Sequence, residues 1–181
     1  MITKRYCLSE IVSINQFTYK NSDGWNCVNY LDTGNITKNS IESIQYIDLS
    51  TEKLPSRAKR KVSFNSIIYS TVRPNQLHYG IIKEIPKNFL VSTGFAVIDV
   101  KDGIVDADYL YYWLTQESIT LKLHSIAEQS VSAYPSIKPS VIADLEIDLP
   151  DIKTQKQIAN ILKSLGDKIE NNSEINDNLS A

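Results

Sequence analysis

Basic side chains gather in one short segment of the chain. Four of them fall within five positions, and a fifth follows one strand-like segment later. The five cations are Arg57, Lys59, Arg60, Lys61 and Arg73. Guanidinium and ammonium groups bind phosphate oxygens, so the cluster predicts a surface that contacts a polyanion. Such a cluster is also typical of a solvated turn, and both interpretations stay open at this point.

The net charge of −2 argues against a polyanion partner at first sight, but the charge is unevenly distributed. Residues 142–181 hold four lysines and eight acidic residues, a net charge of −4, and residues 1–141 carry +2. A positive face is therefore compatible with a weakly acidic chain.

Other chemistries find no support in the sequence. It contains neither a GxGxxG nor a GxxxxGK[ST] loop, no GxSxG elbow and no Asp-Pro-Pro-Tyr signature of an adenine methyltransferase. Its two cysteines lack CxxC spacing, and with two histidines they make no plausible zinc quartet. Asp106 and Asp108 are better explained as helix-start residues than as an acid and base pair. We therefore expect a chain that is not an enzyme and binds no metal or cofactor itself.

The composition fits a chain with one domain and an appendage. Of 181 residues, 42% are hydrophobic and 22% charged, which is enough to bury a sizeable core. No signal-peptide pattern opens the chain, and no uncharged apolar run is long enough to span a membrane. These features predict a cytoplasmic protein with reduced cysteines.

Strands and short helices are expected over the first 150 residues. The predicted strands cover 26–31, 62–72, 79–85 and 95–100, and together they suggest a curved, mostly antiparallel sheet. Asp106 or Asp108 caps a segment with near-helical apolar spacing up to Leu123, and Pro139 opens a short helix over 140–144. The polar segment 128–138 between these helices is suited to recognition. The predicted fold class is α+β.

A long helix is expected at the C-terminal end. A strand-like run over 145–149 is closed by Pro150, and an apolar stripe with helical spacing follows it. The stripe predicts a globular head over 1–150 and a helical stalk over 151–181. A stripe of this kind packs on another helix, as in a coiled coil, or folds back on its own head.

Four segments, in this order, resemble a known family. They are 24–36 (GWNCVNYLDTGNI), 62–74 (VSFNSIIYSTVRP), 90–95 (LVSTGF) and 145–169 (LEIDLPDIKTQKQIANILKSLGDKI). They look like one target-recognition domain and its helical spacer from the specificity subunit of type I restriction-modification systems. Gly166 departs from the family pattern, which has Asp there. Family members normally carry two such units, so this chain resembles either a natural half-subunit that dimerises or a separately produced fragment.

The resemblance implies a function and a set of partners. A specificity subunit reads double-stranded DNA and has no catalysis of its own. It recruits modification subunits, which methylate adenine with S-adenosylmethionine, and restriction subunits, which cut with ATP and Mg²⁺. Two half-subunits would pair as a homodimer and read a bipartite site. The alternative is a non-DNA adaptor, or a competitor that binds the modification subunits.

Residue roles follow from the same resemblance. The five cations would contact phosphates, and polar residues in loops and at strand ends would contact base edges. The latter are Ser70, Thr71, Ser92, Thr93, Ser132, Tyr134 and Lys138. The stalk seam for the second chain or docking subunit would consist of Ile158, Leu162, Leu165, Ile169, Asn172, Ile175 and Leu179.

Overall fold

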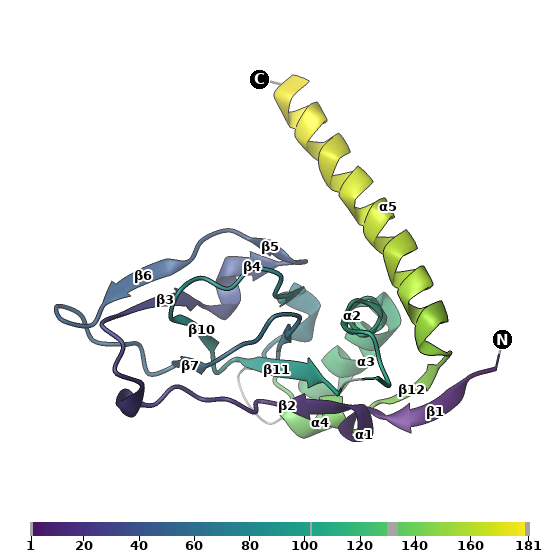
Figure 1. Cartoon of the computed structure of the whole chain (residues 1–181), viewed down its shortest axis with the longest axis horizontal. Coiled ribbons are helices and arrows are strands. Elements are labelled where there is room, and N and C mark those ends of the chain that lie inside the picture. The colour runs from purple at the N-terminus through teal and green to yellow at the C-terminus, as the bar shows by residue number, and fades with distance from the viewer. Residues whose placement is uncertain (1, 102, 130–133, 180–181) are drawn as a thin grey trace.

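The chain has an α+β fold with one long C-terminal helix (Figure 1). The computed structural model describes residues 2–101, 103–129 and 134–179. The strands are β1 (Lys4–Cys7), β2 (Val12–Ile14), β3 (Cys27–Leu31), β4 (Ile36–Thr37), β5 (Ser40–Ile41), β6 (Gln45–Asp48), β7 (Ala58–Arg60), β8 (Ile67–Ser70), β9 (Tyr79–Ile81), β10 (Phe89–Ser92), β11 (Phe95–Val100) and β12 (Glu146–Leu149). The α-helices are α1 (Leu8–Ile11), α2 (Ala107–Leu114), α3 (Glu117–Glu128), α4 (Pro139–Ala143) and α5 (Ile152–Leu179), and short 3₁₀ turns cover Asn21–Asp23, Thr33–Asn35 and Pro74–Gln76.

Two four-stranded sheets form the head. One has the order β2-β11-β8-β9 and is antiparallel throughout, and the other has the order β6-β3-β10-β7 with one parallel pair, β3 and β10. The prediction of mostly antiparallel pairing is confirmed, although the strands form separate sheets. The two sheets meet at the connection Thr93-Gly94, because β10 belongs to one and β11 to the other. This junction organises the candidate site.

Helices α2 and α3 cover the first sheet. The β8 side chains are all buried, and Tyr69 packs face to face on Tyr79, which meets Tyr111 of α2 edge-on. Burial raises the pKa of Tyr111 to a value well above its usual range. The sequence predicts one helical segment here, but the structure has two. The break falls at Thr115, whose hydroxyl donates to the Tyr111 carbonyl and ends α2.

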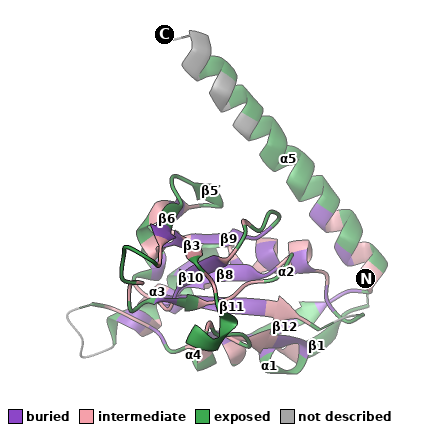
Figure 2. Ribbon diagram, turned by 60° about the vertical axis from the view of Figure 1, so that its left-hand side comes forward, coloured by how far each residue is buried: buried purple, intermediate pink, exposed green. Residues whose placement is uncertain are grey.

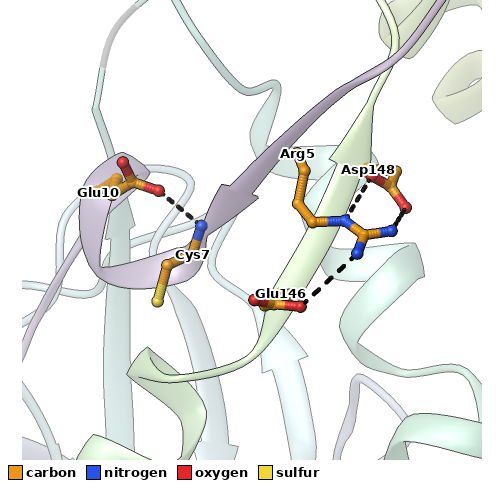
Figure 3. A network of polar contacts seen from close by, with 5 residues as sticks. All are labelled: Arg5, Cys7, Glu10, Glu146 and Asp148. Atoms are coloured by element: carbon orange, nitrogen blue, oxygen red, sulfur yellow. Dashed lines mark hydrogen bonds and ion pairs between the residues drawn. The ribbon is translucent and has the colours of Figure 1, made fainter.

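The N-terminal strand β1, which the sequence pattern did not reveal, pairs with β12, the strand that precedes α5 (Figure 3). Arg5 donates two hydrogen bonds to Asp148, at 3.0 and 2.9 Å, and lies 4.0 Å from Glu146. The hydrogen bond from Arg5 lowers the pKa of Asp148. The three side chains are solvent-exposed, so the ion pairs add little stability beyond the strand pairing. The pairing fixes the strand that leads into α5.

Helix α5 begins on the head and then leaves it (Figures 1 and 2). Asp151 caps its first turn, accepting from the Thr154 amide at 3.0 Å. Gln155 and Ala159 are buried on the head side, where α5 packs on α2. Further along, the apolar side chains are exposed. They are Ile161 (62%), Leu165 (53%), Ile169 (68%) and Ile175 (55%). The long helix is as predicted, and its described apolar side chains are mostly exposed, although Ile169 lines an open hollow together with Ser40 and Tyr111 of the head. Coiled-coil pairing involves a second helix and stays a prediction.

Replacing Gly166 by alanine is expected to stabilise α5. A Cβ at this position would meet no atom within 4 Å, and glycine in a helix interior is less favourable than alanine by about 1 kcal/mol. The helical signal in circular dichroism should therefore rise and persist to higher temperature. Gly34→Ala, in a non-α turn with equally open surroundings, is the control and should leave helicity unchanged. Equal or lower helicity in Gly166→Ala would contradict the expectation.

Candidate nucleic-acid interface

An open hollow of about 480 Å³ lies beside the junction of the two sheets. Its lining comes from the turn after β3, the residue before β7, the end of β8 with the turn that follows, and the segment after α3. The lining residues are Thr33, Arg57, Val72, Arg73, Gln76 and Tyr134. Three predicted site residues from distant parts of the sequence, Arg57, Arg73 and Tyr134, therefore meet in one place.

Arg73 and Tyr134 are held together by their backbones. The Arg73 amide donates to the Pro135 carbonyl at 2.8 Å, and the Ile137 amide donates to the Thr71 carbonyl at 2.9 Å. The Arg73 guanidinium carbon lies 5.5 Å from the centre of the Tyr134 ring, within the range of a cation–π contact. Residues 134–137 are thus attached to the end of β8, as a continuation of the sheet's hydrogen bonding.

The backbone of Arg73 takes a left-handed conformation, with φ of 46°. Pro74 follows it and starts a 3₁₀ turn, in which the Gln76 amide donates to the Arg73 carbonyl at 2.9 Å. A left-handed φ is uncommon for a residue with a side chain and is found more often at binding sites. The turn brings Gln76 to the same hollow that the two arginines line.

Arg57 is attached to the junction itself. Its carbonyl accepts from the Thr93 amide at 2.8 Å, and its guanidinium lies directly against Gly94, in the space that a Cβ would fill. The Gly94 carbonyl in turn accepts from both the amide and the hydroxyl of Thr71, at 2.8 and 2.9 Å. The arginine therefore rests on a backbone that is fixed on both sides.

A carboxylate lies close to Arg57. Asp32 accepts from the Thr33 amide at 2.8 Å and from the Tyr30 hydroxyl at 3.1 Å. Burial alone would raise the pKa of Asp32, but these hydrogen bonds, one from Ser92 and the charge of Arg57 outweigh burial, so that the pKa is lowered. Asp32 is consequently ionised at neutral pH, and the charge of Arg57 contributes to the lowered pKa.

The remaining predicted cations lie elsewhere. Lys61 forms an ion pair with Asp23 at 2.9 Å and lies over the Trp25 ring at 5.2 Å, so its charge is already neutralised locally. Lys59 is exposed, and Arg60 is half-buried on β7; neither lines the hollow. The basic segment is therefore split, and among its members Arg57 contributes to the hollow.

Three of the residues predicted to contact base edges are buried. Their hydroxyl groups form hydrogen bonds within the head. The Ser70 hydroxyl donates to the Val72 carbonyl at 2.8 Å, Thr71 bonds Gly94 as described, and Ser92 accepts from the Gly94 amide at 3.3 Å. Their exposed fractions are 2%, 9% and 0%. The prediction that Ser70, Thr71 and Ser92 reach base edges does not fit this structure, because these hydroxyls hold the backbone beneath the hollow.

The other predicted contacts have different positions. Thr93 is half-buried and its amide holds Arg57, and Lys138 is exposed at the start of α4. Ser132 lies outside the described residues. Sequence reasoning missed Thr33 and Gln76, although each stands in a turn motif, Asp32-Thr-Gly-Asn and Arg73-Pro-Asn-Gln, that could have indicated a surface position.

The predicted stalk seam is largely exposed. Ile158 is half-buried and Leu162 is 37% exposed, whereas Leu165, Ile169, Asn172 and Ile175 are exposed. Leu179 lies outside the residues whose side chains are described. The described seam positions are therefore mostly exposed to solvent. The pairing of this face with a second helix stays a prediction.

The described part of the chain lacks two other kinds of feature. It holds no group of three His, Cys, Asp or Glu side chains that could bind a metal ion. None of its helices has the length and apolar character that crossing a membrane needs.

Known proteins share both the sequence and the fold. The family profile described as type I restriction modification DNA specificity domain matches residues 4–181. The type I restriction enzyme HindI specificity subunit of Haemophilus influenzae is 32% identical over 151 residues, which are 83% of this chain and 32% of that protein. The MjaIX specificity subunit of Methanocaldococcus jannaschii is 29% identical over 148 residues, covering 78% of this chain and 33% of that protein.

Solved structures agree at the level of the fold. The HsdS subunit of Thermoanaerobacter tengcongensis superposes with a TM-score of 0.79 at 18% identity, over 96% of this chain and 44% of that one. A second structure, described as showing the structural basis underlying complex assembly and conformational transition of the type I R-M system, superposes with a TM-score of 0.78 at 20% identity, over 96% of this chain and 44% of that one.

This chain spans about a third of the length of the curated relatives. Both are named specificity subunits, so the prediction of a non-catalytic chain is confirmed at the level of the family. With the match to the family profile over nearly its whole length, the resemblance seen in the sequence is confirmed: the chain belongs to the type I restriction-modification DNA specificity domain family.

Proposed function

We propose that this chain is one DNA-recognition unit of a type I restriction-modification system, and that the hollow around Arg57, Arg73, Gln76 and Tyr134 contacts the DNA. The observation that carries the proposal is the convergence of two arginines, a glutamine and a tyrosine from three segments on one hollow. Arginine and amide side chains are the groups that bind phosphates and base edges.

In this proposal the partners supply the chemistry. Modification subunits bind S-adenosylmethionine and methylate adenine, and restriction subunits use ATP and Mg²⁺, while this chain binds duplex DNA without a cofactor. The helix α5 joins the head to those subunits and to a second recognition unit. Since the chain spans about a third of its relatives' length, a second unit is needed for a bipartite site.

Salt-dependent DNA binding tests this function. The full chain with modification subunits should bind duplex DNA, and Arg73→Ala should weaken binding to all sequences and reduce the slope of log affinity against log salt by about one. Arg5→Ala is the matched control, because Arg5 is an exposed arginine on β1 that does not line the hollow. Fluorescence anisotropy at several salt concentrations measures both quantities.

The outcomes separate the two candidate functions. Equal slopes of log affinity against log salt for Arg73→Ala and Arg5→Ala would show that the hollow is not part of the DNA interface. Tight binding to modification subunits with no selective DNA binding by the complex would support the adaptor or competitor instead. The exposed apolar face of α5 is the observation that supports this second candidate function, the adaptor or competitor.

A further inference from the structure

Gly94 occupies a position where glycine is needed for space. Its φ lies outside the left-handed region, so the backbone itself would accept any residue. An added Cβ would instead meet the Arg57 guanidinium, with its central carbon at 3.5 Å, and the methyl group of Thr33 at 2.8 Å. The absence of a side chain at residue 94 is therefore what lets the Nη2 end of the guanidinium reach the junction.

Two features restrict the position of Arg57. Its backbone carbonyl accepts from the Thr93 amide, and one end of its guanidinium lies against Gly94. A lysine that contacts phosphate needs no such support, because its ammonium group acts as a point charge with any orientation. A fixed guanidinium plane is required instead when two parallel hydrogen bonds are formed to one planar partner.

In duplex DNA the planar partner with two acceptors in the right geometry is the major-groove edge of guanine, through O6 and N7. Resting on the proposed DNA-binding function, we propose that Arg57 is a specificity-determining residue that reads a guanine in the half-site, and that Gly94 is the positioning residue that holds it. Arg73, which contacts the tyrosine ring, and Gln76 complete the same surface.

Site selection from a library of duplexes with random sequence tests this inference, using the full chain with its modification subunits. The wild-type site should contain a guanine that Arg57→Lys no longer selects, with a loss of preference at that position of about 10-fold or more. At the other positions of the DNA site, the base preferences of Arg57→Lys should match those of the wild type. Arg57→Lys keeps the charge, so general affinity and salt slope should change little.

Gly94→Ala tests the positioning role separately. The atoms that its Cβ would displace are the ends of the flexible Arg57 and Thr33 side chains, so the head should still fold. The variant should lose the same guanine preference as Arg57→Lys, with a melting temperature close to that of the wild type. Gly34→Ala, in the nearby turn with nothing within 4 Å, should select the wild-type site.

Each result has a defined meaning. If Arg57→Lys selects the same bases as the wild type at every position, Arg57 contacts phosphate and the inference is overturned. If Arg57→Lys loses the guanine and folded Gly94→Ala keeps it, the positioning role of Gly94 is wrong. A wild-type complex that enriches no sequence at all would instead contradict the proposed DNA-recognition function itself.

Discussion

Replacing Gln155 by alanine is expected to lower the free energy of unfolding by about 3 kcal/mol. The side chain is 1% exposed and bridges three segments at the base of α5. Its carbonyl accepts from the Asp106 amide at 2.9 Å, and its amide donates to the carbonyls of Ile104 and Pro150, at 3.1 and 2.9 Å. Truncation leaves these backbone groups without their partner at the base of α5, and each unsatisfied buried group costs about 1–3 kcal/mol. Urea unfolding followed by circular dichroism measures the loss.

The same helix offers a matched control. Gln157 is exposed two residues further on, so Gln157→Ala should change stability by less than about 0.5 kcal/mol. Gln155→Glu keeps the shape but directs a carboxylate at two carbonyl oxygens, and it should destabilise like alanine. Equal stability of Gln155→Ala and Gln157→Ala would show that the bridge contributes nothing.

Gln155 also fixes the direction of α5 relative to the head. The residue joins the helix to the start of α2 and to the end of β12, so its loss removes three hydrogen bonds that restrict the angle between them and leaves the packing of α5 on α2. Spin labels on the head and on the distal part of α5 should give a narrow distance distribution in the wild type and a broader one in Gln155→Ala. A fixed angle is what two recognition units need to stay in register on one DNA duplex.

Local patterns allowed much of the fold to be predicted. Strand β11 and helix α4 agree with the predicted segments to within a residue or two, because apolar runs and Pro139 mark them in the sequence. The predicted 79–85 strand is shorter, ending at Ile81. Strand β1 was not foreseen, because it is defined by pairing with β12, about 140 residues away, and not by its own pattern.

The site was harder to predict for the same reason. The positions of Arg57 and Arg73 in the sequence indicated basic surface, but the contact of Arg73 with Tyr134 depends on a pairing between distant segments. Lys61 carries the same charge as Arg57 and lies in the same segment of the sequence, yet Asp23 neutralises it, and no spacing rule reveals that partner. Gln155 lies within the family-like segment 145–169, whereas its bridge to Asp106 is a property of the packed structure.

The apolar face of α5 leads to the second large prediction. Leu165 and Ile169 are 53% and 68% exposed, so aspartate at both positions leaves the single chain folded. If two chains pair along this face, each buried Leu or Ile contributes about 1.5–3 kcal/mol, and the double variant should weaken the dimer by about 100-fold or more. Light scattering over a range of concentrations should give a dimer for the wild type and a monomer for Leu165→Asp, Ile169→Asp.

The control places the same charge beside the apolar face. Asn160→Asp, Ser164→Asp adds two aspartates at exposed polar positions of α5 and should leave the dimer intact. A wild-type chain that stays monomeric at all concentrations, or a dimer that survives Leu165→Asp, Ile169→Asp, would contradict pairing along this face. If the expected pattern holds, identical chains related by a two-fold axis place two copies of the same hollow on opposite-facing half-sites. The preferred DNA sequence must then be an inverted repeat interrupted by unread bases, whose length is set by α5 and by the angle that Gln155 fixes.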